Sequence, residues 1–387
     1  MKKALFITTI SGFLPQFEMS DVGILQELGY EVHYASNFRN PVYPFKREDL
    51  RSKGIKLHNI SVVKNPLKLY DNIDAADEIC DLIDREGIDL VHCHNPMGAA
   101  IGRFASHFSK RKPYVIYTAH GLHFYRNAPM INWILYYPAE KIMAHFTDAI
   151  ITINEEDYRR AKKCLSLKKN GFIAQIHSVG VDRERFSPKP GLNEEVRKEL
   201  NIPSDAFHIV TAAELNNNKN QKVVIEAIAA CKNDKIYYSI CGKGKNKNRL
   251  KALIRRYGLK DRVRLLGFRT DMERVLQSAD AFAFPSIREG LGVAAVEALS
   301  CGIPLIASDN RGTREYAKDG VNAIVCDSGS VRDFKEAIEK LSSDKNYRKL
   351  LANNCRESSE KFDKKEVRKA MYAIYKKAEE LCLRSQS

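Results

Sequence analysis

Short apolar runs alternate with longer amphipathic stretches along the chain. This alternation is typical of repeated strand, helix, strand units with mostly parallel sheets. In the first half, strands are predicted at Ala4–Thr9, Glu31–Ser36, Lys56–Ile60, Asp89–His94, Tyr114–Ala119, Ala149–Ile153 and Ile173–Val179. A helix is predicted over Asp71–Glu86, because apolar residues there share one face and Gly87 supplies a C-terminal stop.

The pattern is interrupted once and then starts again. Gly180-Val181-Asp182 and the turn-rich stretch from Phe186 to Gly191 fit an interdomain linker. Beyond it, strands are predicted at His208–Ala213, Ile236–Cys241, Val263–Gly267, Ala281–Pro285, Pro304–Ala307 and Ala323–Cys326, with helices that include Asn220–Cys231 and Gly292–Ser300. The expected organisation is two doubly wound α/β domains, residues 1–184 and 185–365, with ligands at the carboxyl ends of the strands and in the cleft between the domains.

Length, apolar runs and cysteine usage limit the classes of protein to which the chain can belong. A length of 387 residues fits two domains, and no apolar run approaches the roughly 18–20 residues of a membrane span. Lys2 and Lys3 before an apolar stretch resemble the start of a signal peptide. Thr8, Thr9 and Ser11 interrupt the apolar stretch, so a first strand is expected instead. Nine cysteines without a CxxC pair indicate reduced thiols in the cytoplasm.

The formal charge of +15 calls for an anionic partner: nucleic acid, acidic lipid or a phosphorylated small molecule. Basic residues are dense in the first domain, and those of its first cluster are Arg39, Lys46, Arg47, Arg51, Lys53, Lys56, Lys64 and Lys68. Phe38, Tyr43 and Phe45 interleave this cluster, which favours a surface for anionic lipid headgroups over a merely solvated face. No nucleic-acid-binding motif accompanies the charge, so nucleic acid is not an expected partner.

The strongest chemical signal is the segment from Arg288 to Leu299, which follows an apolar strand and runs directly into a helix. Its glycines place backbone N–H groups at a helix N-terminus, where they can hold an anion such as phosphate. Glu289 and Glu297 lie about two helical turns apart, so they can receive hydroxyl groups at two points of one elongated ligand. The alternative is a capping acid followed by a solvated glutamate.

This segment resembles the E-x7-E signature of the retaining glycosyltransferases of family 4, which have the GT-B fold. Other landmarks of that family follow in order, namely Gly12-Phe13, His120-Gly121, Gly180-Val181-Asp182, Lys219-Asn220 and Leu266-Gly267-Phe268. The resemblance is closest to bacterial exopolysaccharide and capsule enzymes. It implies an α/β fold of two Rossmann-like domains that face a cleft, with the C-terminal helix, residues 366–387, packing back on the first domain.

The resemblance also implies roles for residues of this chain. Catalysis would rest on His120 near the reacting centre, Lys219 at the donor diphosphate and Glu289 at the donor sugar. Donor binding would further involve Gly12, Phe268, Arg269, Gly290, Leu291, Gly292 and Glu297. Of these, Glu297 would bind the ribose hydroxyls, and the turn at Phe268-Arg269 would hold the base.

One position departs from the family pattern. Relatives usually carry Gly-Arg five residues before the lysine, whereas this chain has Ala213-Glu214. A carboxylate aimed at the diphosphate would repel it. Either Glu214 turns away or pairs with a cation, and Lys243, Lys245 or Arg269 supplies the missing charge, or activity is impaired.

No metal or redox cofactor is expected. His92, Cys93, His94, His120 and His123 could be considered for zinc, but no further thiolate or carboxylate spacing supports such a site. There is also no Asp-x-Asp motif, so lysines and backbone dipoles would carry the leaving-group charge. The run from Gly242 to Lys247 lacks the third glycine of a dinucleotide fingerprint.

The sequence therefore predicts a metal-independent retaining glycosyltransferase of the hexosyltransferase type. Its expected donor is a nucleotide sugar, most simply a UDP-sugar, and its expected acceptor is a hydroxyl of a lipid-linked saccharide or polysaccharide precursor. It would work in the cytoplasm as a peripheral protein at the inner face of the cell membrane. The alternatives are a nucleotide-sugar epimerase of the same architecture and a catalytically impaired donor-binding subunit.

Overall fold

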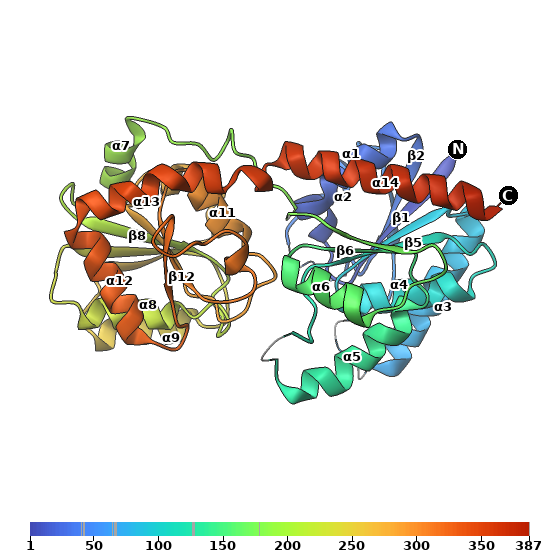
Figure 1. Cartoon of the computed structure of the whole chain (residues 1–387), viewed down its shortest axis with the longest axis horizontal. Helices are drawn as coiled ribbons and strands as arrows, with labels where there is room; N and C mark the ends of the chain where they lie inside the picture. Colours follow the sequence, from blue (N-terminus) through green and yellow to red (C-terminus); the bar gives the residue numbers. More distant parts are fainter. Residues whose placement is uncertain are drawn as a thin grey trace. The chain divides into compact units, whose positions relative to one another are not determined.

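The computed structural model describes residues 1–386 apart from 40, 42, 64, 66, 67, 126, 127 and 178, so Lys64 of the basic cluster lies outside the described residues. The chain forms two compact units (Figure 1). The first unit comprises Met1–Val179 and Lys365–Ser387, and the second comprises Gly180–Lys364. The unit boundary thus falls a few residues before the predicted domain boundary between 184 and 185.

The first unit is built on a parallel sheet with the strand order β3-β2-β1-β4-β5-β6-β7. Its strands are β1 Lys2–Thr8, β2 Tyr30–Ser36, β3 Lys56–Asn59, β4 Leu90–His94, β5 Tyr114–Ala119, β6 Ala149–Thr152 and β7 Phe172–Gln175. Its helices are the π-helix η1 Leu14–Glu18, then α1 Met19–Glu27, α2 Arg47–Arg51, α3 Leu69–Glu86, α4 Pro96–Phe108, α5 Met130–Ala144 and α6 Glu155–Cys164. Helix α3 ends as expected at Gly87, which has a φ of +68°.

The second unit has a parallel sheet with the strand order β10-β9-β8-β11-β12-β13. Its strands are β8 Phe207–Ala212, β9 Ile236–Cys241, β10 Val263–Gly267, β11 Ala281–Phe284, β12 Leu305–Ser308 and β13 Ala323–Cys326. Its helices are α7 Leu192–Glu199, α8 Gln221–Ala230, α9 Lys247–Arg256, α10 Met272–Leu276, α11 Val293–Ser300, α12 Val331–Ser343 and α13 Lys345–Ser358, with 3-10 turns at Thr313–Glu315 and Glu360–Phe362.

Both sheets reverse their strand order next to the first strand of the unit, which is the arrangement of doubly wound Rossmann-like domains. The predicted α/β class is therefore confirmed. The predicted strands all occur, and most of their bounds agree with the structure to within one residue. The largest difference is in Ile173–Val179, which was wrong beyond Gln175, because the chain leaves the sheet there.

The buried strands explain why the apolar runs are continuous. Every residue of β4 and of β5 is buried, as expected when helices cover both faces of a parallel sheet. In the second unit, β11 is likewise buried along its whole length. The polar side chains that these strands carry, among them His92, His94 and Thr118, are consequently buried as well.

The last helix, α14 Lys364–Gln386, packs on the first unit from Lys365 onward, as predicted. The buried hydroxyl of Tyr375 lies 2.7 Å from His92 Nδ1 and 3.0 Å from Asp21 Oδ2. Arg368 donates a hydrogen bond to the carbonyl of Ser20. A search of the described helices finds none long and apolar enough to cross a membrane.

The two ends of the second unit lie side by side. The amide of Val181 donates to the carbonyl of Phe362 at 2.8 Å, and the amide of Lys364 donates to the carbonyl of Val181 at 2.9 Å. Gly180 has a φ of +85°, and a Cβ there would lie 2.7 Å from Lys364 Cα. Only glycine fits this close approach of two backbone segments.

Tyr375→Phe should destabilise the first unit, because His92 and Asp21 would each lose a buried hydrogen-bond partner. The expected loss in free energy of unfolding is about 1–3 kcal/mol. Urea denaturation followed by the fluorescence of Trp133, the single tryptophan of the chain, measures this unit. The matched control is Tyr372→Phe, a half-exposed position on the same helix, and an equal effect of both changes would contradict the assignment.

Candidate active site

The loop between β11 and α11 is held by hydrogen bonds from neighbouring loops. The amide of Ile287 donates to the carbonyl of Asn218 at 2.8 Å, and Asn218 Nδ2 donates to the carbonyl of Arg288 at 2.8 Å. Asn310 Nδ2 donates to the carbonyl of Ser286 at 2.9 Å. These contacts fix the loop at the carboxyl end of β11, where a doubly wound domain binds its ligand.

Gly292 is the residue where this loop turns into α11. Its φ is +105°, and a Cβ would lie 2.6 Å from Phe284 Cζ and 2.7 Å from the Tyr316 hydroxyl oxygen. The Tyr316 hydroxyl donates to the carbonyl of Leu291 at 3.0 Å. The N-cap residue of α11 is Gly292, which has no side chain to cap the helix, so the N-terminal dipole receives no cap from this position.

The structure brings together two of the predicted catalytic residues, Lys219 and Glu289. Lys219 Nζ lies 2.5 Å from Glu289 Oε1, and it lies 5.6 Å from the centre of the Phe284 ring. The backbone of Lys219 is fixed because its amide donates to Asn216 Oδ1 at 3.0 Å. Arg311 Nε donates to the carbonyl of Glu289 at 3.3 Å. A diphosphate that binds Lys219 would therefore compete with the Glu289 carboxylate for the ammonium group.

Glu297 lies on α11 in a less polar environment than Glu289. Burial raises its pKa from the ordinary value of 4.5 to about 7, and the positive charge of Arg185 opposes this shift. Arg185 itself pairs with Glu273 at 2.7 Å, and it also donates to the carbonyl of Thr270. Near neutral pH the Glu297 carboxyl group can thus exist in either protonation state.

The predicted base-binding turn is present, but its arginine is already paired. Phe268 is largely exposed, and Lys243 Nζ lies 5.8 Å from the centre of its ring. Arg269 donates to Asp271 Oδ2 at 2.6 Å and to Glu199 Oε1 at 3.3 Å. These two carboxylates neutralise Arg269, so it is a poor source of charge for a diphosphate.

Glu214 is exposed. Within the described parts of the chain, its carboxylate forms no hydrogen bond or ion pair, and its carbonyl accepts a hydrogen bond from Gln221 Nε2. The structure thus gives no counter-ion for Glu214, and the exposed side chains of Lys243 and Lys245 remain candidates for the missing charge.

The glycines beside these lysines have a packing role. A Cβ on Gly242 would lie 1.9 Å from the carbonyl oxygen of Ala213, and one on Gly244 would lie 2.4 Å from that of Leu215. The loops after β8 and β9 therefore touch backbone to backbone. This backbone contact accounts for both glycines, so a role in binding a dinucleotide is not needed to explain the glycine-rich run.

In the first unit, His120 is partly exposed and adjoins the buried residues His94 and Glu18. His120 Nε2 lies 3.1 Å from His94 Nδ1 and 3.7 Å from Glu18 Oε1, and His94 Nδ1 lies 3.5 Å from the same oxygen. Burial lowers the pKa of His120 to about 4, lowers that of His94, and raises that of Glu18. His120 is consequently a neutral imidazole at pH 7.

The glycine loop lies beside this cluster. The ring of Phe13 meets the His120 ring edge-on, with centres 5.0 Å apart. Gly12 has a φ of +82°, and a Cβ there would lie 2.3 Å from the carbonyl oxygen of Tyr43. Its lack of a side chain is therefore required by the fold, whether or not the loop also touches a donor.

The histidines considered for zinc do not form one set of metal ligands, although the rings of His92 and His94 lie 4.2 Å apart. His92 contacts Tyr375 and Thr118, and the His123 ring packs against Tyr136. Glu18, His94 and His120 instead offer ligand atoms that all lie within 4.8 Å of one another. Sequence analysis missed Glu18, because no spacing in the chain connects it with the two histidines.

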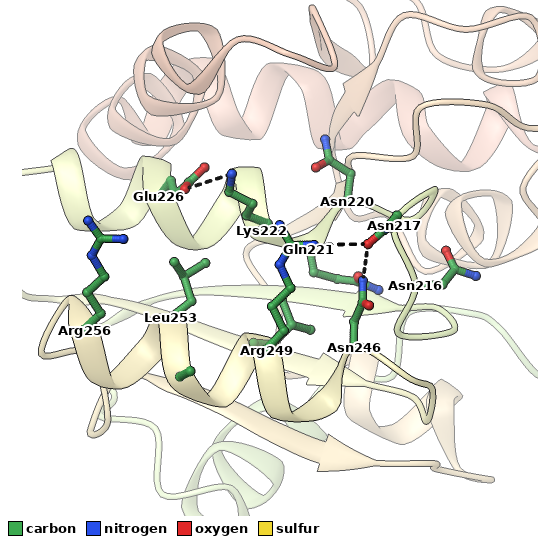
Figure 2. A pocket seen from close by; sticks show the side chains of 12 residues that line it. Asn216, Asn217, Asn220, Gln221, Lys222, Glu226, Asn246, Arg249, Leu253 and Arg256 are labelled. Atoms are coloured by element: carbon green, nitrogen blue, oxygen red, sulfur yellow. Dashed lines mark hydrogen bonds and ion pairs between the residues drawn. The ribbon is translucent and has the colours of Figure 1, made fainter.

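A polar groove of about 570 Å³ lies between α8 and α9 of the second unit (Figure 2). Asn217 accepts a hydrogen bond from Asn246 there, and Lys222 pairs with Glu226. Asn216 and Asn220 line it beside Lys219, but none of the predicted donor-binding residues does. We therefore place the candidate active site at the carboxyl edge of the sheet and not in this groove.

The fold and these residues define a class of enzyme. Residues 193–358 match the family model described as "Glycosyl transferases group 1", and residues 4–154 match that described as "Glycosyl transferase 4-like". HepE of Anabaena, solved in complex with UDP, superposes with a TM-score of 0.78 at 19% identity over 97% of this chain and 100% of that one, a likeness in fold. The chain belongs to the family 4 glycosyltransferases of the GT-B fold.

Individual relatives show which members it is similar to. EpsD of Bacillus subtilis (strain 168), which is named as a glycosyltransferase, is 35% identical over 97% of this chain and 96% of its own length. The UDP-Gal:alpha-D-GlcNAc-diphosphoundecaprenol alpha-1,3-galactosyltransferase of Escherichia coli is 27% identical over 77% of this chain and 76% of its own length. The expected likeness to exopolysaccharide enzymes is confirmed.

Glu289→Gln should leave UDP affinity unchanged or raise it by up to about tenfold, because Lys219 would no longer be neutralised by a carboxylate. Turnover should fall by about ten- to a hundredfold through loss of a charged hydrogen-bond acceptor for the sugar. Calorimetry with UDP and a sugar-transfer assay measure the two effects. Glu226→Gln, which breaks the Lys222 pair, is the control, and a marked loss of UDP affinity in Glu289→Gln would contradict the assignment.

UDP affinity should rise with pH through about 7, because a carboxylate accepts hydrogen bonds from both ribose hydroxyls better than a carboxylic acid does. In Glu297→Gln this rise should be smaller. The UDP phosphate also titrates, but equally with both proteins. The difference between their profiles of UDP affinity against pH, measured by calorimetry from about pH 6 to 8, therefore reports on Glu297 alone. Parallel profiles would show that Glu297 does not bind the nucleotide as an anion.

Proposed function

We propose that the chain transfers a sugar from a UDP-sugar to a hydroxyl of a lipid-linked saccharide or polysaccharide precursor, with retention of configuration. The observation that carries this proposal is the Lys219–Glu289 pair beside the uncapped N-terminus of α11. Two names support the choice of substrates. The Escherichia coli relative is named for a UDP-sugar and a diphosphoundecaprenol-linked acceptor, and the HepE structure holds UDP.

In this mechanism the chain's own charges stabilise the departing diphosphate. Lys219 and the backbone dipole of α11 would take up the negative charge that develops on the leaving oxygen. Glu289 would accept hydrogen bonds from the donor sugar, and Glu297 from the ribose. The acceptor would attack on the face from which the diphosphate leaves, and the leaving phosphate would take its proton.

His120 would bind the donor as a neutral imidazole. A pKa near 4 keeps it uncharged at pH 7, so it could hydrogen-bond a sugar hydroxyl without adding positive charge near the reacting carbon. The contacts with His94 and Glu18 would fix its ring. His120 is thus assigned to positioning of the donor, while Lys219 carries the charge.

We also propose that the protein works at the inner face of the cell membrane. Lys46, Arg47, Arg51 and Lys53 are exposed, and Arg47 also donates a hydrogen bond to the carbonyl of Phe38. Of the aromatic side chains in this cluster, Phe38 is buried, the Phe45 ring packs against it, and the Tyr43 ring packs edge-on against Phe17. Any contact of this cluster with lipid is therefore electrostatic.

The test is transfer from a panel of UDP-sugars to an undecaprenyl diphosphate-linked saccharide in the presence of EDTA. Turnover should persist in EDTA, and Lys219→Ala should lower it by about two orders of magnitude, whereas the neighbouring Lys222→Ala should leave it unchanged. Loss in EDTA with recovery in Zn²⁺ or Mn²⁺ would overturn metal independence and point to the Glu18, His94 and His120 cluster. Epimerised donor without transfer would identify an epimerase instead.

A further inference from the structure

Three atoms that can bind a metal ion meet beside the glycine loop of the first unit. Glu18 ends the π-helix η1, His94 ends β4, and His120 follows β5. His94 Nδ1 and His120 Nε2 are 3.1 Å apart, and Glu18 Oε1 lies 3.5 Å from the first nitrogen and 3.7 Å from the second. The three atoms thus form a nearly equilateral triangle.

The size of this triangle matches the coordination sphere of a zinc ion. Zinc binds histidine nitrogen and carboxylate oxygen at about 2.0–2.2 Å, and tetrahedral geometry then separates two ligand atoms by about 3.3–3.6 Å. The observed separations of 3.1, 3.5 and 3.7 Å lie inside or close to this range. One ion can therefore contact all three atoms after small shifts of the side chains.

The carboxylate oxygen of the triangle has no hydrogen-bond partner. Glu18 is buried, and among the described residues no group donates a hydrogen bond to Glu18 Oε1. A second buried carboxyl group, that of Asp21, interacts with Glu18 electrostatically. Arg368 opposes the charge of Asp21 and pairs with Glu27. Since a buried polar atom without a partner destabilises the fold, a cation in the triangle would relieve an existing cost.

One side of the triangle is accessible. The side chain of His120 is 23% exposed, whereas those of His94 and Glu18 are 0 and 6% exposed. A cavity of about 10 Å³ adjoins Glu18 and His120, and Asp21 and Thr118 also line it. This volume holds about one water molecule. It provides room for the water that completes the coordination of zinc where the protein supplies three ligands.

Another group of two histidines and a glutamate lacks this geometry. His33 contacts His58 through Nδ1 at 3.0 Å and Glu31 through Nε2 at 2.9 Å. Because the two ring nitrogens point in different directions, the three side chains do not converge on one point. Glu31 Oε1 also accepts a hydrogen bond from Lys56 at 2.9 Å. This group therefore supplies a matched control.

We propose that Glu18, His94 and His120 bind one Zn²⁺ ion and that bound zinc inhibits sugar transfer. Two imidazoles and one carboxylate favour zinc over Mg²⁺ and Ca²⁺, which prefer oxygen ligands. The inhibitory part rests on the proposed function, in which His120 positions the donor as a neutral imidazole. Zinc takes up Nε2 of His120 and adds positive charge near the reacting carbon. This charge opposes the positive charge that develops on the sugar as the diphosphate leaves.

The first test is calorimetric titration of the whole chain, stripped with EDTA and dialysed, with Zn²⁺ in the absence of nucleotide sugar. The wild type should bind one ion per chain. Glu18→Gln keeps the size of the side chain and removes its charge, and it should lower zinc affinity by about a hundredfold or more, because loss of an outer-shell partner alone lowers it about 10- to 100-fold. His94→Gln should have a similar effect, and the control Glu31→Gln should change affinity by less than about threefold.

Two results would overturn the site. These are absence of zinc binding by the wild type and equal zinc affinity in Glu18→Gln and Glu31→Gln. Urea denaturation followed by the emission of Trp133 checks that each variant is folded. The changes at Glu18 and at His94 remove different ligands, so each tests the site independently of the other.

The second test measures sugar transfer at increasing Zn²⁺ concentration, with each protein compared with its own rate in EDTA. The wild type and Glu31→Gln should be inhibited at the same zinc concentration, whereas Glu18→Gln should require about a hundredfold more. Equal inhibition of all three proteins, or activity that rises with Zn²⁺, would overturn the inhibitory role. A wild type without transfer activity would count against the proposed function alone, because zinc binding is measured without donor or acceptor.

Discussion

Parallel pairing of every strand in both sheets is the constraint on which the functional chemistry depends. Parallel strands must be joined by crossover helices, so helices cover both faces and the strands themselves are apolar. The carboxyl ends of all strands then meet at one edge of each sheet. His94 ends β4 and His120 follows β5, while Lys219 and Glu289 lie in the loops that follow β8 and β11. Residues far apart in sequence are thereby collected without any local motif.

The carboxyl groups at these edges fall into two kinds. Glu289 and Asp271 each form an ion pair with a cation, and they thereby reduce the positive charge available to a ligand. Glu297 and Glu18 are shifted mainly by loss of water, which raises the pKa of each. The candidate site of the second unit therefore combines Glu289, which pairs with a lysine, and Glu297, whose pKa is raised to about 7. Its electrostatics therefore depend on which partner each carboxyl group has, and not on the number of charges.

The strands could be predicted from the sequence because burial on both faces leaves a continuous apolar run, and the loop before α11 because its glycines stand between an apolar strand and a helix. The hydrogen-bond and ion-pair partners of individual side chains could not be predicted in this way. Arg269 was assigned to the base or the diphosphate, whereas Asp271 and Glu199 hold it. The exposed apolar side of α5 could not be predicted either, because an apolar helix is usually buried in the core. The packing shows that Trp133 and Tyr137 face inward, whereas Ile134 and Leu135 are exposed.

The paired backbone segments at Val181 and Phe362 have a consequence for biosynthesis. The second unit is an insertion whose two ends emerge together, whereas the first unit is discontinuous and needs α14, which follows the second unit in the chain. The inserted unit can fold as soon as its own chain is available. The first unit must wait with the partners of Tyr375 exposed, so nascent chains should be most dependent on chaperones until α14 has been synthesised.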